Sequence, residues 1–194
     1  RRVDITVSEA TNFIVPQKAL NLVKSAFIPS DAPVQIDYNE SNAFFKSNDV
    51  LLVCRLIDQK YPDYENVIPT DNPGKLMVSR KDLLGTLKRV NIFANKTSHQ
   101  VRFKVTGSEL TISAEDLDFA NEAKESLKCH YEGNDLEIGF NATLLIEIIN
   151  NSDTDEVLIE LSTPNRAGIV LPSEQIEGEN LLMLVMPVML NTYA

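Results

Sequence analysis

The feature that most constrains the fold of this chain is a pattern that occurs three times: a strand, a short helix and then several strands. In each pass an apolar stretch leads to a residue that can begin a helix, namely Pro16, Ser79 and Asn141. The helices begin near residues 17, 80 and 142, at an interval of about 62 residues. This interval predicts one structural unit used three times, although the copies share no evident sequence identity.

Each pass contains a helical segment with one apolar face. The segments are predicted at 17–27, 80–93 and 142–150, because apolar residues recur there at intervals of three and four. The residues expected to face inward are Ala19, Leu20, Leu22, Val23, Ala26 and Phe27 in the first helix, Leu83, Leu84, Leu87 and Val90 in the second, and Leu144, Leu145, Ile148 and Ile149 in the third. The pattern predicts short helices that pack against sheets.

Strands are predicted where short apolar or alternating runs are bounded by turn residues. The expected ranges are 12–15, 34–38, 43–46, 50–56, 75–78, 101–106, 109–113, a part of 119–131, 136–140, 156–162, 168–171 and 181–186. The short turns between neighbouring strands favour antiparallel pairing. The sequence therefore predicts an α+β fold.

The last apolar run, 181–190, is interrupted by Pro187. Proline has no N–H group for a sheet, so the strand is expected to end near Met186. The Met-rich residues beyond it suggest a groove wall that receives apolar side chains of a partner, because methionine adapts to varied shapes. The alternative is a core strand with a frayed end.

Composition sets limits on the function. The chain has 194 residues, 43% of them hydrophobic, and a net charge of −10, which indicates one large or two small globular domains and excludes a nucleic-acid footprint over the whole surface. Cys54 and Cys129 lie in apolar stretches and are expected to be buried free thiols. The last apolar run of the chain is too short to span a membrane, and no signal peptide is recognised. The expected location is cytoplasmic.

Basic residues are concentrated on the first two helices. The first carries Lys18 and Lys24, and the second carries Arg80, Lys81, Lys88 and Arg89 on one arc beside its leucine face. Such a face predicts sequence-independent contact with phosphates. A solvated helix face explains the same pattern equally well.

The sequence gives little support to catalysis. His99 and His130 have no partner at a recognised motif spacing, and no nucleotide-binding loop, nucleophile elbow or metal-binding motif is present. No cofactor or metal is therefore expected. Two functions outside DNA binding stay open: a sheet-rich protein-binding scaffold, and an enzyme that uses His130 with carboxylates such as Glu132.

Separated stretches of the chain resemble the bacterial DNA sliding clamp, the beta subunit of DNA polymerase III. Residues 58–69, with Tyr-Pro-Asp-Tyr at 61–64 and Val-Ile-Pro at 67–69, resemble its interdomain linker. Residues 136–141 (Leu-Glu-Ile-Gly-Phe-Asn) are similar to the start of its last half-domain, and 185–190 (Val-Met-Pro-Val-Met-Leu) to its C-terminal end. Residues 13–18 fit the entry to the second half of its middle domain.

The resemblance implies a DNA-clamp fold of repeated half-domains, with sheets outside and short helices lining one face. Residues 1–57 would be the second half of the middle domain, 58–69 the interdomain linker and 70–194 the complete C-terminal domain. Members of the family are homodimeric rings that encircle double-stranded DNA without sequence preference and tether the polymerase without catalysing a reaction. The first domain and half of the middle one would be absent here, so this chain alone is not expected to close a ring.

The resemblance also implies site residues. The DNA-lining residues would be Lys18, Lys24, Arg80, Lys81, Lys88 and Arg89, and the dimer interface would include Ile92 and Phe93. A peptide groove would accept short apolar motifs of the DNA polymerase III alpha subunit, the clamp loader and repair proteins. Its residues would be Pro62, Asn66, Val67, Leu184, Val185, Met186, Pro187, Val188, Met189 and Leu190.

Two departures from the family pattern bear on that groove. Better-known members carry arginine where Asn66 and Met189 stand, so polar contacts with a peptide are expected to differ. Residues 191–194 extend past the usual end of the family, and the hypothesis is that they lie over the groove.

Overall fold

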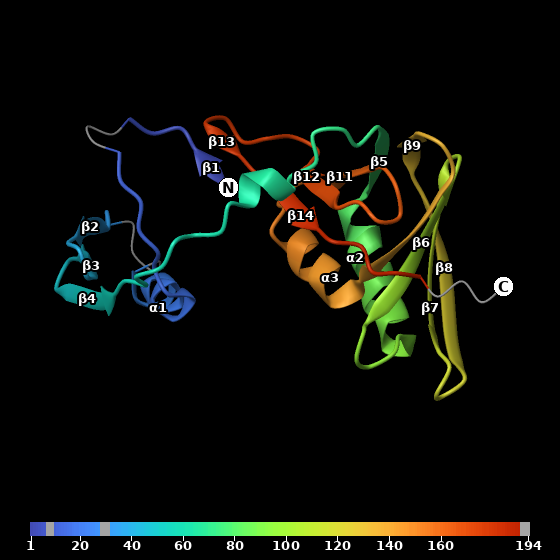
Figure 1. Cartoon of the computed structure of the whole chain (residues 1–194), viewed down its shortest axis with the longest axis horizontal. Coiled ribbons are helices and arrows are strands. Elements are labelled where there is room, and N and C mark those ends of the chain that lie inside the picture. The colour runs from blue at the N-terminus through green and yellow to red at the C-terminus, as the bar shows by residue number, and fades with distance from the viewer. Residues whose placement is uncertain (7–9, 28–31, 191–194) are drawn as a thin grey trace. The chain divides into compact units, whose positions relative to one another are not determined.

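The computed structural model describes residues 1–6, 10–27 and 32–190 (Figure 1). The chain divides into two compact units. The small unit is Thr6–Asp63, and the large unit combines Arg1–Ile5 with Tyr64–Ala194. Residues 191–194, for which a position over the groove is the hypothesis, lie outside the described residues.

The small unit is one helix and one antiparallel sheet. Helix α1 spans Gln17–Phe27, and the sheet has the order β2-β3-β4, formed by Gln35–Tyr38, Asn42–Ser47 and Val50–Arg55. Its core is small: Phe27, Ala43 and Phe45 are buried, and a few half-buried residues pack around them. This agrees with the helix and the three strands that the sequence predicts for this region.

Two expectations for the small unit are wrong. The range 12–15 is not a strand, since only Ile14 forms an isolated bridge, with Ile57. Leu20, Leu22 and Ala26 do not face inward. The two leucines are about half exposed, and Ala26 is exposed as well. The described sheet has three strands, so only a narrow strip of α1, around Ala19, Val23 and Phe27, finds apolar neighbours.

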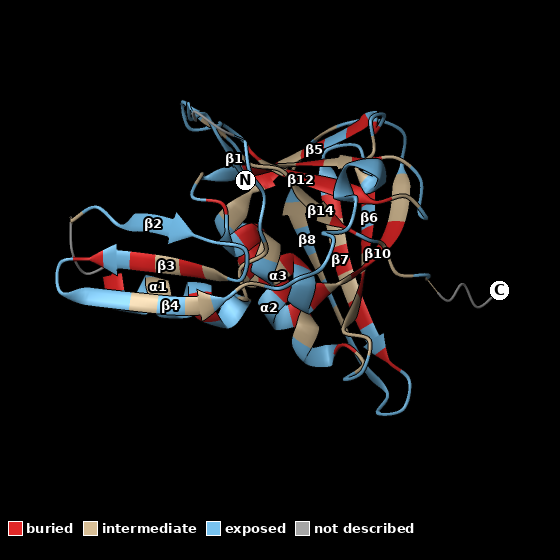
Figure 2. Cartoon of the chain, turned by 60° about the vertical axis from the view of Figure 1, so that its left-hand side comes forward, coloured by how far each residue is buried: buried red, intermediate tan, exposed pale blue. Residues whose placement is uncertain are grey.

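In the described residues of the large unit, two large antiparallel sheets accompany one short two-stranded pair. The strand orders of the large sheets are β10-β6-β7-β8 and β14-β12-β11-β5-β9. The strands are β5 Gly74–Ser79, β6 Gln100–Thr106, β7 Glu109–Asp116, β8 Asn121–Lys128, β9 His130–Glu132, β10 Leu136–Asn141, β11 Glu156–Leu161, β12 Gly168–Pro172 and β14 Met183–Val185. Buried residues alternate with less buried ones along β7 (Figure 2), so the sheet has one inner and one outer face.

The two repeats of the large unit exchange their first strands. Strand β5 opens the second pass of the pattern, but it pairs with β11 of the third pass, with Leu76 opposite Ile159. Strand β10 opens the third pass, but it pairs with β6 of the second, with Ile138 opposite Phe103. Each sheet therefore contains strands from both repeats.

Helices α2 (Arg80–Val90) and α3 (Ala142–Asn150) each follow an exchanged strand directly. The Oγ atom of Ser79 accepts the N–H of Asp82 at 3.3 Å, and Oδ1 of Asn141 accepts the N–H of Leu144 at 3.1 Å. These side chains satisfy N–H groups that the first helical turn leaves unpaired. The predicted starts of both helices are confirmed.

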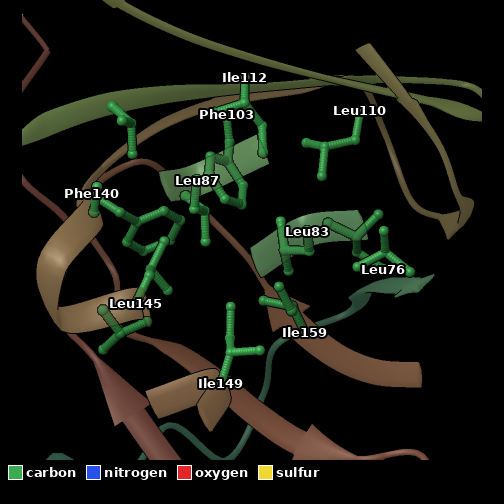
Figure 3. Close-up of a cluster of buried hydrophobic side chains, with 14 of the residues drawn as sticks. Leu76, Leu83, Leu87, Phe103, Leu110, Ile112, Phe140, Leu145, Ile149 and Ile159 are labelled. Atoms are coloured by element: carbon green, nitrogen blue, oxygen red, sulfur yellow. The ribbon is translucent and has the colours of Figure 1, made fainter. Parts of the chain in front are cut away.

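The core of the large unit lies between the two helices and the inner faces of the sheets (Figure 3). Leu83 and Leu87 of α2 and Leu145 and Ile149 of α3 are fully buried, and the rings of Phe103 and Phe140 meet edge to face at 5.4 Å. The expected inward face of α2 is confirmed. For α3 the expectation is wrong at Leu144, which is 50% exposed.

Short elements complete the large unit. Strand β1 (Arg2–Val3) pairs with β13 (Glu179–Asn180), and neither was expected. A 3-10 turn, η1 (Tyr64–Val67), lies within the expected linker, and a second, η2 (Asn91–Phe93), ends the segment predicted as the second helix. Among the described residues, no helix is long and apolar enough to cross a membrane. The two cysteines, Cys54 and Cys129, are free thiols, as expected, but they are half-buried instead of buried.

The last apolar run forms a shorter strand than expected. Both backbone groups of Leu181 bind the side-chain amide of Gln175, at 2.8 and 2.9 Å, instead of a neighbouring strand. Strand β14 therefore begins at Met183 and ends at Val185, two residues before Pro187. We call the five residues after it, Met186–Leu190, the tail.

Candidate functional site

A pocket of about 440 Å³ lies in the large unit where η1, β1 and the chain leading into β14 meet. Its apolar lining comes from Val67, Ile68, Leu182 and Leu184. Its polar lining comes from Arg1, Arg2, Tyr64, Glu65 and Asn180. We call it the η1 pocket. A lining that combines apolar and polar residues suits short apolar side chains that are carried on a peptide backbone.

The pocket is built from segments that are far apart in the sequence. Pairing of Arg2 with Asn180 and of Val3 with Glu179 brings the start of the chain to one wall. Pairing of Leu184 with Ile169 fixes β14 as another wall. Arg1 Nε lies 3.2 Å from Glu179 Oε2 in an ion pair. Arg2 Nη2 lies 3.9 Å from Glu65 Oε1, and because both of these side chains are largely exposed, this contact constrains Arg2 little.

Only two of the residues expected in the peptide groove line the η1 pocket, Val67 and Leu184. Asn66 lies beside Val67 in η1. Val185 faces the opposite way and is only 2% exposed, within the main core. Pro62 belongs to the small unit, so its position relative to the pocket is not described.

The tail continues beyond the η1 pocket. Met186 and Met189 are 60% and 76% exposed, whereas Pro187, Val188 and Leu190 are half-buried. Leu190 lines a different hollow of about 650 Å³, on the outer face of the β10-β6-β7-β8 sheet. The ion pair between Arg102 and Glu137 crosses the floor of that hollow.

The sequence reasoning missed seven residues of the η1 pocket: Arg1, Arg2, Tyr64, Glu65, Ile68, Asn180 and Leu182. Leu182 could have been found, because alternate residues of an extended segment share a face and Leu184 was expected. No sequence signal marks Arg1 or Arg2, since the two-residue pairing of β1 with β13 brings them there.

The basic residues on α2 differ in whether they form hydrogen bonds or ion pairs with other groups of the chain. Lys81 and Lys88 are exposed, and within the described residues neither has an ion-pair or hydrogen-bond partner. They lie two helical turns apart and so point from the same face. Arg80 is half-buried, and its Nε donates to the carbonyl oxygen of Thr154 at 2.8 Å.

Arg89 is held by the edge strand β8. Its Nε and Nη2 donate to the two carboxylate oxygens of Glu125 at 2.7 and 2.6 Å, and buried Thr86 donates to the same carboxylate at 2.8 Å. The hydrogen bond from Arg89 lowers the pKa of Glu125, and the same bond raises the pKa of Arg89. Of the four basic residues predicted on α2, two are therefore engaged within the fold.

The other predicted residues are accessible. Lys18 and Lys24 are exposed on α1 in the small unit. Ile92 and Phe93 are 64% and 40% exposed in η2. Two large apolar side chains in adjacent exposed positions are available for contact with another protein surface.

The catalytic alternative finds no assembled site. His130 Nε2 lies 3.3 Å from Glu132 Oε1, but both side chains are largely exposed on the short edge strand β9. His99 binds Asn91 Oδ1 through Nδ1 at 3.1 Å. Across the described ranges, no group of three or more metal-ligating side chains comes together. The pair on β9 lacks the enclosed pocket that a general base requires.

Comparison with known proteins gives a consistent result. Residues 65–188 match the family of the DNA polymerase III beta subunit, C-terminal domain. The beta sliding clamp of Chlamydia muridarum is 28% identical over 190 residues, which is 97% of this chain and 50% of that protein.

Solved structures agree with this match. A DNA polymerase III subunit beta from Borrelia burgdorferi, solved in complex with a natural product, superposes with a TM-score of 0.88 at 26% identity, over 97% of this chain and 49% of that one. A sliding clamp from Bartonella birtlesii bound to griselimycin gives a TM-score of 0.86 at 27% identity, over 92% and 47%.

This chain spans about half the length of the curated relatives it matches. The superpositions confirm the expected α+β sliding-clamp fold, and the family match covers nearly the whole large unit. The chain therefore belongs to the family of the DNA polymerase III beta subunit, the bacterial sliding clamps.

Proposed function

We propose that this chain is a part of a sliding clamp, whose whole protein forms a homodimeric ring around double-stranded DNA in the cytoplasm. The ring tethers the replicative polymerase and other partners and catalyses no reaction itself, without a cofactor. In this proposal residues 1–57 belong to the middle domain, 58–69 form the linker and 70–194 form the C-terminal domain. Family membership supports the proposal.

The single observation that carries the peptide-binding part is the η1 pocket. It joins Val67 and Leu184, two residues that the clamp resemblance had independently assigned to a peptide groove. Its apolar walls fit the side chains of a short linear motif, and its two arginines fit carbonyl or carboxylate oxygens of the peptide. The partners are the polymerase alpha subunit, the clamp loader and repair proteins.

Peptide binding can be measured by fluorescence polarisation with a labelled Gln-Leu-Ala-Leu-Phe peptide. We expect saturable binding, and the substitution Leu184→Ala should weaken it about tenfold, because it removes an apolar wall. Leu171→Ala is the matched control, since Leu171 is also a half-buried leucine of the same sheet but lies outside the pocket. Equal losses for both variants would count against the pocket as the site.

The DNA-binding part depends on Lys81 and Lys88, with Lys18 and Lys24 on α1. Exposed ammonium groups without partners among the described residues can approach phosphates without sequence preference. We expect Lys81→Glu with Lys88→Glu to weaken association with a labelled duplex and to reduce the slope of log affinity against log salt by about 2. The control reverses Lys104 and Lys124, two exposed lysines on the outer sheet face.

The control makes the DNA test specific. If both double variants weaken duplex binding equally, the effect is one of net charge and the scaffold function without a DNA role is preferred.

The interface part of the proposal concerns Ile92 and Phe93. In the whole protein, replacing both with serine should shift sedimentation from dimer to monomer.

A further inference from the structure

We propose that Gly139 and Gln100 are positioning residues for the peptide site, because together they hold the tail against the outer edge of the β10-β6-β7-β8 sheet. We call these two residues the tail seat. The inference rests on the proposed peptide-binding function, with the peptide site extended from the η1 pocket to the tail that the clamp resemblance assigns to the groove. It adds two residues that do not line the η1 pocket.

The tail has few other attachments. Its described backbone forms two hydrogen bonds with the rest of the chain: the N–H of Val188 donates to the carbonyl oxygen of Gly139 at 2.9 Å, and Gln100 Nε2 donates to the carbonyl oxygen of Met189 at 3.2 Å. Met186 and Met189 are mostly exposed, so their side chains do little to hold the segment. The direction in which these methionines point is therefore set by the backbone anchors, together with the half-buried side chains of Pro187, Val188 and Leu190.

Residue 139 must be glycine for this contact. On β10, Glu137, Gly139 and Asn141 alternate with the buried Ile138 and Phe140, so a side chain at 139 would project from the outer face. A Cβ atom there would lie 2.5 Å from the carbonyl oxygen of Val188 and 2.8 Å from Leu190 Cδ2. Because the first of these is a backbone atom, the tail itself has to move.

The seat matters for binding because it orders the tail in advance. A peptide that contacts a loose segment must also fix its backbone and side chains, and this lowers the affinity. With the seat intact, that ordering is already present in the free protein. Gly139→Ala should therefore weaken binding although residue 139 does not touch the peptide.

The four methionines allow the tail to be observed directly. Met186 and Met189 report on the tail, whereas Met77 and Met183 lie in strands β5 and β14. In methyl-labelled protein, Gly139→Ala should shift and narrow the signals of Met186 and Met189. The signals of Met77 and Met183 should stay in place, which shows that the domain is still folded.

Affinity for the labelled Gln-Leu-Ala-Leu-Phe peptide is measured on the same samples. We expect Gly139→Ala to weaken it about tenfold and Gln100→Ala by a smaller factor, since the second change removes one anchor without adding a clash. Gly85→Ala is the matched control, because a Cβ at Gly85 meets only the guanidinium end of Arg89, at 3.1 Å. This variant should bind like the wild type.

The outcomes separate the two proposals. Unchanged Met186 and Met189 signals in Gly139→Ala, or unchanged peptide affinity where the wild type binds, overturn the tail seat. If the wild type does not bind the peptide at all, the peptide-binding part of the proposed function fails for this chain, and the methyl signals alone decide whether the seat holds the tail. Movement of all four methyl signals would mean that Gly139→Ala unfolds the domain. The tail seat is then tested with Gln100→Ala, and unchanged Met186 and Met189 signals or unchanged peptide affinity in that variant would overturn it.

Discussion

At the scale of single residues, Arg89 shows how the fold can engage a charge that the sequence presents as free. The sequence places Arg89 on the same basic arc of α2 as Lys88 and predicts the same contact with phosphates for both. In the structure, however, the carboxylate of Glu125 on β8 accepts hydrogen bonds from two nitrogen atoms of Arg89. That partner is 36 residues away and was not predicted, because the distance between α2 and β8 depends on the packing of the whole unit. Lys81 and Lys88 therefore carry more of the proposed DNA contact than Arg89.

The pairing predicts a dependence of stability on pH. Because the fold lowers the pKa of Glu125, its carboxylate stabilises the folded state above the unfolded value of roughly 4.3, and this contribution disappears as the pH falls through the folded pKa. We expect the difference in melting temperature between wild type and Glu125→Gln to be present at pH 6 and to shrink steadily as the solution is acidified below the unfolded pKa. Calorimetry with the exposed Glu147→Gln as control checks this. A difference that grows on acidification would contradict it.

Two leucines of the helices give a matched prediction. Leu87 is fully buried, while Leu144 is half exposed, although both were predicted to face inward. Leu87→Ala should lower the free energy of unfolding by about 2–5 kcal/mol, because it leaves a cavity. Leu144→Ala should cost less than about 1 kcal/mol. Urea denaturation measures both. Equal costs would mean that Leu144 is covered in solution.

At the scale of elements, the N-caps connect the exchanged strands to the helices. Both caps were predicted from the residue types alone, since Ser79 and Asn141 accept hydrogen bonds from local N–H groups. Asn141 has an additional task that the sequence does not reveal: its Nδ2 donates to the carbonyl oxygen of Ser98, 43 residues away, at 2.9 Å. It thereby ties the start of α3 to the loop before β6.

The two caps should differ in their contribution to stability. Ser79→Ala removes one long hydrogen bond, so we expect a loss of about 1 kcal/mol or less. Asn141→Ala removes the cap and the bond to Ser98, so the loss should be larger, about 2 kcal/mol. Chemical denaturation of both variants checks the order. A larger loss for Ser79→Ala would show that the long-range bond is unimportant.

The elements also show what sequence periodicity can and cannot predict. Most strands and all three helix starts were found, because alternation, turn residues and caps are local signals. The short β1–β13 pair was missed, since two-residue strands carry no period, and it supplies Arg1 and Arg2 to the η1 pocket. Three of the nine residues that line the pocket, Arg1, Arg2 and Asn180, therefore depend on a strand pairing that no local sequence pattern predicts.

At the scale of the whole molecule, the two units differ in the size of their cores. Three buried apolar residues form the described core of the small unit, whereas the core of the large unit draws on both sheets and on α2 and α3. Buried apolar surface is the main source of stability, so the small unit should open at a lower free energy.

Hydrogen exchange can test this difference. We expect backbone amides of β3 to exchange at least about 100-fold faster than those of β11, a ratio that corresponds to roughly 2.7 kcal/mol in opening free energy. Mass spectrometry of peptides that cover 42–47 and 156–161 measures both rates in one sample. Equal protection would mean that the small unit gains stability that its own core does not explain.

The exchange of first strands between the repeats has a consequence for synthesis on the ribosome. Strand β5 is made early, but it cannot enter its place between β9 and β11 until Leu161 has left the exit tunnel. At about 5–20 residues per second, that delay is roughly 4–16 s. Meanwhile β6, β7 and β8 can close as successive hairpins, so the nascent chain acquires one sheet first and leaves Leu76 and Val78 exposed to water and chaperones until the last repeat arrives.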